Sequence, residues 1–258
     1  MPYKTIDYEK RDNVGIISFN RPKVLNAQNR QLVEDFIDAL KNVEGDPEIK
    51  AVIVRGKGRA FCSGDDLSED HAIGSMEEGF RIIQKLQDTT RVIMNMPKPV
   101  IAAVHGYALG AGCEWAMNCD IRIAAEGTQF GFPEARVGAT VTNAGTKLLP
   151  ALIGLGRAKQ MIFSTGFIDA EKAEQWGLVN QVVPESKLES TALEMAKQFI
   201  ENSSLSIALS KKALNQGIYQ GLEETLEHES RDIAISIREF EAAQRARAVL
   251  AEMKKKEH

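Results

Sequence analysis

The sequence predicts an α/β protein with largely parallel strand pairing, followed by a helical region at the C-terminus. Short apolar runs of strand length alternate with longer segments of helical periodicity, up to a last predicted strand at Leu178–Val183. Such alternation is typical of strand–helix–strand units, because parallel neighbours need a long connection between them. The chain has 258 residues, of which 43% are apolar and 26% charged, which is ample for one core and an appended subdomain.

The first part of the chain predicts a hairpin, a helix and a further strand. Val14–Phe19 is predicted to be a buried strand that pairs with Tyr3–Glu9. A helix follows, because apolar residues then recur at helical spacing until Gly45 ends it. These residues are Leu32, Val33, Phe36, Ile37, Leu40 and Val43. Ala51–Val54 is the next strand, and it leads into a polar loop at Arg55–Asp66 that contains glycine.

The middle of the chain continues this alternation. A helix is predicted over Met76–Met96, ending before Pro97, and the apolar strand Val100–Val104 follows. A short helix is predicted to start at the Gly110 turn, and the strand Ile121–Ala125 comes after it. The Gly110 turn therefore joins the end of a strand to the start of a helix.

After the last strand the chain is predicted to be helical to its end. We place the boundary between an α/β core, residues 1–195, and a helical region, residues 196–258. The helices of this region carry apolar faces formed by Leu205, Ile207, Leu209, Leu214, Ile218, Leu222, Leu226, Ile233, Ile235, Ile237 and Phe240. A thin subdomain cannot bury all of these alone, so they pack either on the chain's own core or against another subunit.

Composition and termini exclude several classes of protein. The formal net charge is −4 and the pI about 5.7, which favour neither nucleic acid nor an anionic membrane as a partner. The three cysteines, Cys62, Cys113 and Cys119, are odd in number and form no C-x-x-C pair, so they suit reduced thiols better than disulfides or a metal site. The N-terminus has no signal-peptide pattern, and the longest apolar run is too short to span a bilayer. We therefore expect a cytoplasmic protein without a metal.

The Gly110-Ala111-Gly112 turn is the first candidate for chemistry. At the start of a helix the amide N–H groups lack partners and the helix dipole is positive. The amide of Ala111 can then hydrogen-bond an oxygen that gains negative charge during a reaction. An ordinary strand-to-helix turn is the alternative. A dinucleotide-binding fingerprint is excluded, because Trp115 stands where a third small residue is needed.

The loop over residues 60–67 offers a second backbone amide, at Asp65. The alternative is a solvated loop with side-chain-to-backbone turns. Cys62 and Ser63 are poor candidates for a nucleophile, because none of the four histidines stands in a recognisable nucleophile-elbow arrangement with them.

Two glutamates lie in apolar surroundings that disfavour a charge. Glu114 is flanked by Cys113 and Trp115, and Glu134 follows an aromatic and proline-bearing stretch. One strand separates them, so they can converge on one cleft, where two carboxyl groups can act as general acid and general base. Structural salt bridges with Arg122 or Arg136 are the alternative.

These segments together resemble the crotonase superfamily of enoyl-CoA hydratases and isomerases over nearly the whole chain. The matching segments, in order, are Asn20–Ala27, Ala60–Leu67, Lys98–Glu114 and Phe130–Glu134. The resemblance implies a spiral of ββα units, with a C-terminal helical region that forms trimers or dimers of trimers.

The resemblance also implies the reaction and its residues. The substrate is an acyl-CoA, with no separate cofactor, and its thioester oxygen sits between the amides of Asp65 and Ala111. In hydratases of this family the residue matching Glu114 activates water and the residue matching Glu134 protonates Cα. Isomerases typically keep only the second glutamate, so the presence of both favours hydration. The expected CoA and substrate contacts are Lys23, Val24, Leu25, Asp66, Leu67, Thr142 and Asn143.

One stretch departs from the family pattern. Hydratases usually continue after the second glutamate with G-x-x-P-G-x-G-G-T, whereas this chain has Val141 for the proline and polar Thr142 and Asn143 for small residues. If both face the acyl pocket, they favour a short, cyclic or oxygenated acyl group, because buried polar groups need partners. Alternatively, either caps the helix that begins near Ala144. Double-bond isomerisation and a non-catalytic RNA-binding role are the competing functions, and RNA binding would need a basic stripe that the scattered charges do not form.

Overall fold

The computed structural model describes residues 3–69, 74–217, 220–238, 244–246 and 253. The chain divides into two compact units, Met1–Ile200 and Glu201–His258. The predicted boundary after residue 195 falls inside a helix, α8 (Leu188–Ile200), and the division follows the end of that helix. Within the described residues, each helix is too short or too polar to cross a bilayer.

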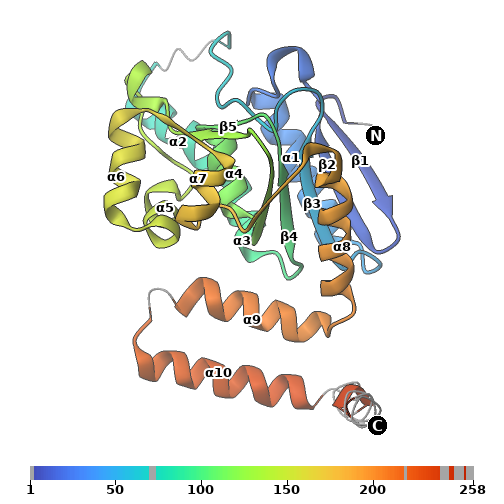
Figure 1. The fold of residues 1–258 in the computed structure, drawn as a ribbon. Helices are drawn as coiled ribbons and strands as arrows, with labels where there is room; N and C mark the ends of the chain where they lie inside the picture. Colours follow the sequence, from blue (N-terminus) through green and yellow to red (C-terminus); the bar gives the residue numbers. More distant parts are fainter. Residues whose placement is uncertain (1–2, 70–73, 218–219, 239–243, 247–252, 254–258) are drawn as a thin grey trace. The chain divides into compact units, whose positions relative to one another are not determined.

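The first unit is built around a six-stranded sheet in the order β1-β2-β3-β4-β6-β9 (Figure 1). Its strands are β1 (Ile6–Arg11), β2 (Val14–Phe19), β3 (Ala51–Gly56), β4 (Val100–Val104), β6 (Ile121–Ala125) and β9 (Gln181–Val183). Only β1 and β2 pair antiparallel in this sheet, as the predicted hairpin, and the other neighbours are parallel. The α/β prediction with largely parallel pairing is therefore confirmed.

The central strands β2, β3 and β4 are buried on both faces for most of their length, which explains why they are mostly apolar. Alternate residues point to opposite faces: in β3, Ile53 belongs to one core and Val54 to the other. The first core lies under α8, whose Leu188, Ala192 and Ala196 cover it. The second core is larger and holds the aromatic side chains that surround Trp115, namely Phe19 and Phe36.

A second, three-stranded sheet in the order β5-β7-β8 was not predicted. Its strands are β5 (Tyr107–Leu109), β7 (Gln129–Gly131) and β8 (Phe167–Asp169). Each has only three residues, too few for a periodicity of two to stand out in the sequence. β5 ends just before the Gly110 turn and β7 ends shortly before Glu134, so the small sheet positions the backbone of these candidate site residues.

Helices of the first unit cover both faces of the main sheet and enclose the small one. They are α1 (Arg30–Gly45), α2 (Met76–Leu86), α3 (Asp88–Asn95), α4 (Ala111–Asn118), α5 (Gly145–Ile153), α6 (Leu155–Ser164), α7 (Ala170–Trp176) and α8, with 3₁₀ turns η1 (Pro22–Val24), η2 (Glu134–Val137) and η3 (Glu185–Lys187). The helix from Arg30 begins at an Asn29 cap, whose Oδ1 accepts the Leu32 N–H at 2.9 Å, and it includes Gly45 as its last residue.

Two predicted elements were wrong in extent. The helix predicted over Met76–Met96 is divided at Gln87 into α2 and α3, where the Thr89 hydroxyl donates to the Leu86 carbonyl at 2.8 Å. A side chain that takes a backbone carbonyl in this way competes with the helical ladder. The predicted strand Leu178–Val183 is shortened to β9, because the Leu178 and Val179 amides instead donate to the Ala173 carbonyl beyond the end of α7.

The second unit contains two described helices that contact each other, α9 (Ser204–Gly217) and α10 (Leu222–Ile237). Most of the large apolar side chains of these helices that the sequence singled out remain exposed in the single chain; they are Leu214, Leu222, Leu226, Ile233, Ile235 and Ile237. Ile218 and Phe240, predicted to extend these faces, lie outside the described residues.

Candidate active site

The turn before α4 places a helix N-terminus beside the small sheet. Gly110 has φ 51° and ψ −124°, a conformation that only glycine adopts readily, and its N–H donates to the Gly131 carbonyl at 2.9 Å. Ala111 is the first residue of α4, so its N–H precedes the helical ladder and lies at the positive end of the helix dipole. The backbone therefore points a donor out of this turn.

The loop that carries Asp65 is fixed against the same turn. The Cys62 N–H donates to the Tyr107 carbonyl at 3.0 Å, and the Leu109 N–H returns a bond to the Cys62 carbonyl at 3.1 Å. A Cβ on Gly112 would collide with that Cys62 carbonyl, so the close approach requires glycine. A Cβ on Gly110 would lie only 3.7 Å from the Gly64 Cα. The peptide units that precede Asp65 and Ala111 are therefore neighbours in space.

Glu134 directs its carboxyl group at this junction. It is the first residue of η2, and its Oε1 lies 2.9 Å from the position that a Cβ on Gly110 would occupy. Its Oε2 is buried and has no hydrogen-bond partner among the described residues. Burial raises the pKa of Glu134, and the nearby Asp65 carboxylate raises it further. An unpartnered buried oxygen of this kind can receive a proton from a bound molecule or deliver one to it.

Glu114 lies in α4 with its side chain almost fully buried. The Thr142 N–H donates to Oε1 at 2.5 Å, and the Asn143 Nδ2 donates to Oε2 at 2.8 Å, with a longer bond of 3.3 Å from the Thr142 hydroxyl. The pKa of Glu114 is raised to about 7: burial is the largest cause, Glu134 also raises it, and the donors Asn143 and Thr142 lower it. Glu134 thus affects the ionisation of Glu114.

The salt-bridge alternative for these glutamates finds no support. Arg122 donates to the backbone carbonyls of Leu178 and Cys119, at 2.6 and 2.7 Å. Arg136 donates to the hydroxyl and carbonyl of Thr165, at 2.8 and 2.9 Å. Both guanidinium groups are therefore engaged elsewhere.

The two side chains that depart from the family pattern both face Glu114. Helix α5 begins at Gly145 with Ala144 as its N-cap residue, and no side chain forms a capping hydrogen bond there. The alternative that Thr142 or Asn143 caps this helix was therefore wrong. Because both side chains donate to Glu114, neither needs an oxygenated acyl group as a partner. The argument for an oxygenated substrate from unsatisfied polarity therefore no longer holds.

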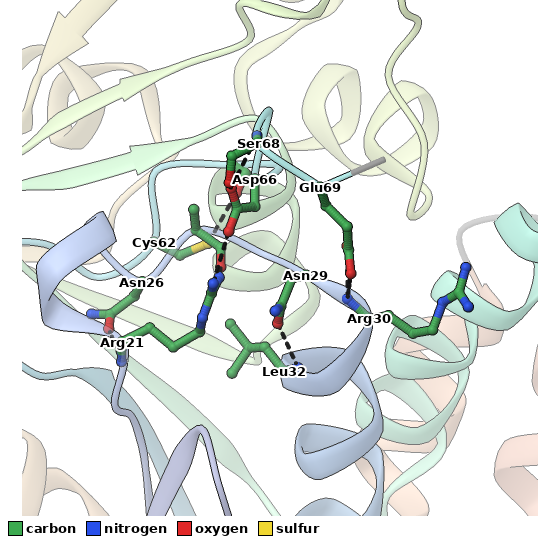
Figure 2. A network of polar contacts seen from close by, with 11 residues as sticks. Arg21, Asn26, Asn29, Arg30, Leu32, Cys62, Asp66, Ser68 and Glu69 are labelled. Atoms are coloured by element: carbon green, nitrogen blue, oxygen red, sulfur yellow. Dashed lines mark hydrogen bonds and ion pairs between the residues drawn. The ribbon is translucent and has the colours of Figure 1, made fainter. Parts of the chain in front are cut away.

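The predicted CoA segment is attached to the loop that carries Asp65. Lys23 and Val24 lie exposed in η1, and the Leu25 carbonyl accepts the Ser63 N–H at 3.1 Å. Figure 2 shows how Arg21 forms an ion pair with Asp66 at 2.8 Å, while the Ser68 hydroxyl donates to the same carboxylate at 2.6 Å. The Asp66 carboxylate therefore already has hydrogen-bond partners within the protein.

Leu67, the next residue of this loop, is largely exposed. The loop continues to Glu69, whose carboxylate accepts the Arg30 N–H at the start of α1 at 3.0 Å (Figure 2). The polar contacts drawn in Figure 2 thus hold the loop at Asp66, Ser68 and Glu69, the residues that follow Asp65.

The cysteines are structural. All three are buried and none forms a disulfide, and burial raises the pKa of Cys62 to about 12. A thiol of this kind is a poor nucleophile at neutral pH, as the sequence indicated.

Two polar residues near Glu114 were missed by the sequence analysis. Asn118 and Thr90 are buried, and the Asn118 Nδ2 donates to the Thr90 hydroxyl at 2.8 Å. Thr90 in turn contacts Asn143, through a bond of 3.4 Å from its hydroxyl to Oδ1. One signal was available: Asn118 stands four residues after Glu114, and residues at that spacing share a helix face.

The site thus places two buried carboxyl groups near the backbone amides of a helix N-terminus, an arrangement suited to acid–base chemistry. The model of the enoyl-CoA hydratase/isomerase family matches residues 9–256. The chain belongs to the enoyl-CoA hydratase/isomerase family.

Individual relatives agree with this assignment. The chain is 39% identical over 237 residues to a short-chain-enoyl-CoA hydratase of Clostridium acetobutylicum, covering 89% of this chain and 88% of the relative. It is 38% identical over 232 residues to a crotonyl-CoA hydratase of Syntrophomonas wolfei, with the same coverage. The crystal structure of an enoyl-CoA hydratase from Bacillus anthracis superimposes with a TM-score of 0.91 at 32% identity, covering 96% of this chain and 97% of that one. The predicted crotonase fold is thereby confirmed.

Proposed function

We propose that this protein is an enoyl-CoA hydratase that adds water across the 2,3 double bond of a short-chain enoyl-CoA. The observation that carries the proposal is the pair of buried carboxyl groups, Glu114 and Glu134, beside the Gly110–Ala111 turn. Relatives named for short-chain and crotonyl-CoA hydration support the substrate class.

In the proposed reaction the thioester oxygen accepts hydrogen bonds from the amides of Asp65 and Ala111. These donors stabilise the negative charge that the oxygen gains as the enolate forms. Glu114 takes a proton from water while the water oxygen bonds to C3, and Glu134 delivers a proton to C2. Return of one proton from Glu114 to Glu134 through solvent restores the starting state.

The CoA part of the substrate is proposed to lie along Lys23, Val24 and Leu25, with Asp66 and Leu67 lining the neighbouring loop. The bond from Ser63 to the Leu25 carbonyl supports this, because it connects the segment with the loop that carries Asp65. The reaction as proposed needs no cofactor beyond the CoA of the substrate.

Activity is expected to depend on pH through Glu114. Because a general base must be ionised, hydration of crotonyl-CoA should fall as pH drops through about 7, where Glu114 takes up a proton. The measurement is loss of the conjugated enoyl absorbance with a panel of straight, branched and cyclic enoyl-CoAs between pH 5 and 9. Absence of hydration across the whole panel would contradict the proposed function.

We also propose that the second unit forms a homotrimer or a dimer of trimers. Leu222, Leu226, Ile233 and Ile237 recur at helical spacing along α10, and each is at least 46% exposed in the single chain. An apolar stripe of this kind on a helix is expected to be covered by another subunit.

The assembly is tested by light scattering coupled to size-exclusion chromatography. The wild type should elute as a trimer or hexamer, and Leu226→Glu/Ile233→Glu should lower the mass, because two buried unpaired charges disrupt an apolar contact. Glu224→Lys changes the charge at an exposed position on the opposite side of the same helix and is the control. A monomeric wild type would show that the stripe is not an interface.

A further inference from the structure

Asn143 lies in the stretch that departs from the family pattern, and its surroundings are unusual. It is 2% exposed and has φ 43°, in the left-handed region that asparagine tolerates better than most residues. The next residue, Ala144, is also left-handed at φ 62°. This double turn points the Asn143 side chain back toward Glu114 of α4, and its Nδ2 donates to the Glu114 Oε2 at 2.8 Å.

The orientation of the Asn143 amide follows from its neighbours. Thr90 has one hydroxyl proton, and its oxygen already accepts the Asn118 Nδ2 at 2.8 Å. The hydroxyl is therefore free to donate to the Asn143 Oδ1, at 3.4 Å. With Oδ1 held by this donor, Nδ2 must face Glu114. The chain from Asn118 through Thr90 and Asn143 to Glu114 thus runs donor to acceptor in one direction, and each bond polarises the next.

The rest of the turn also lies against the Glu114 carboxylate. The Thr142 N–H donates to Oε1 at 2.5 Å, a contact that any residue except proline can make at this position. A Cβ on Gly145 would lie 3.2 Å from that same Oε1, so the glycine keeps the space beside the carboxylate open. The donors to Glu114 that depend on a side chain are therefore Asn143 and, at the longer distance of 3.3 Å, Thr142.

We propose that Asn143, aimed by Thr90 and Asn118, is a positioning residue that orients the Glu114 carboxylate and stabilises its ionised form. The inference rests on the proposed function, in which Glu114 is the base that activates water. A donor to the ionised form lowers the pKa of a carboxyl group, which offsets part of the effect of burial at Glu114.

Other ionisable groups near Glu114 are accounted for. The charge that acts on its pKa is Glu134, and the adjacent Cys113 is a buried thiol whose own pKa is raised. Elements packed against α4 carry Asp88 and Arg91 on α3, Lys147 on α5, Tyr107 on β5 and Arg122 on β6. Arg91 bonds Asp88 and the Gln84 carbonyl, and Arg122 bonds backbone carbonyls.

The first test is the pH profile of kcat/KM in Asn143→Gly, which keeps the left-handed backbone and removes the donor. A hydrogen bond to a charged group corresponds to roughly one to two pKa units. The acid limb of the profile, where kcat/KM falls at low pH, should therefore shift to higher pH by about that much. At pH 7 this lowers hydration by roughly 5- to 50-fold, and raising the pH should restore most of it. Ala144→Gly makes the same kind of change at the neighbouring left-handed position and should leave the limb in place.

Two further variants guard against a simple loss of structure. Thr90→Val removes the hydroxyl that aims Asn143 and should move the limb in the same direction by a smaller amount. Thr89→Val is its matched control, because Thr89 is equally buried but bonds Trp115 and the Leu86 carbonyl instead. Asn143→Asp replaces the donor with a second carboxyl group and should move the limb at least as far as glycine does.

A direct titration separates this inference from the proposed function. Infrared difference spectra between wild type and Glu114→Gln isolate the Glu114 carboxyl band, which can be followed with pH in each variant without any substrate. A Glu114 band that titrates at the same pH in Asn143→Gly as in wild type would overturn the inference, as would an unchanged kinetic limb. If wild type hydrates no enoyl-CoA, the proposed function fails, while the infrared titration still decides the role of Asn143.

Discussion

Glu114→Gln and Glu134→Gln are each expected to lower kcat/KM for enoyl-CoA hydration by about 100-fold or more. Each substitution removes a group that exchanges a proton with the reacting molecule, and general acid–base catalysis typically contributes about 10²–10⁴-fold. The double variant should lose less than the product of the two single effects, because residues that act as a unit are not additive. The measurement is steady-state loss of enoyl absorbance with crotonyl-CoA.

The two variants should differ in stability, which provides a check on the structure. Glu134 Oε2 has no partner among the described residues, so an amide is tolerated there. Glu114 accepts bonds from Thr142 and Asn143, and an amide nitrogen would meet a donor at one of its two positions. Glu114→Gln should therefore melt at a lower temperature than Glu134→Gln, and circular dichroism must show that both are folded.

Glu126→Gln, at an exposed position after β6, is the control for the loss of one carboxylate. It should leave both turnover and melting temperature unchanged. If Glu114→Gln keeps near-full turnover on an isomerisable substrate while Glu134→Gln is inactive, the reaction is isomerisation with one carboxylate and not hydration.

The sequence could predict the main sheet because its strands carry their own signal. β2, β3, β4 and β6 are largely buried on both faces, and such burial leaves a mostly apolar run, which Arg122 interrupts in β6. The amphipathic helix Arg30–Gly45 was likewise predicted from one apolar face. The three-residue strands of the small sheet were not, because their pairing depends on partners far away in the chain.

The site shows the same division between local and distant information. The turn at Gly110 and the two glutamates could be predicted from the sequence. Glycine marks a tight turn, and an acidic residue is rare among apolar neighbours. The partners of Glu114 are not, since Thr142 and Asn143 lie 28 and 29 residues away and reach it through a left-handed turn. A polar pair beside an expected pocket suggested a contact with substrate, whereas the structure directs both residues to the glutamate.

The backbone at Gly110 gives the second large expected effect. Gly110→Ala would place a Cβ 2.9 Å from the Glu134 Oε1, at a φ of 51° and ψ of −124° that an L-residue adopts only with strain. The end of a glutamate side chain yields more easily than backbone, so we expect Glu134 to be displaced while the protein remains folded. Misplacement of a reacting group by about 1 Å can cost on the order of 10²-fold in rate, so kcat should fall by roughly that factor.

The control for Gly110→Ala is Gly127→Ala, which also places alanine at a positive φ, here 76°, but meets no atom within 4 Å. It should reproduce the strain, seen as a lower melting temperature, and leave kcat unchanged. Because Gly110→Ala adds its methyl group beside Glu134 and leaves Glu114 with the same donors, the acid limb attributed to Glu114 should remain near pH 7. A folded Gly110→Ala variant with wild-type kcat would show that the carboxyl group of Glu134 is not needed at the position where it lies.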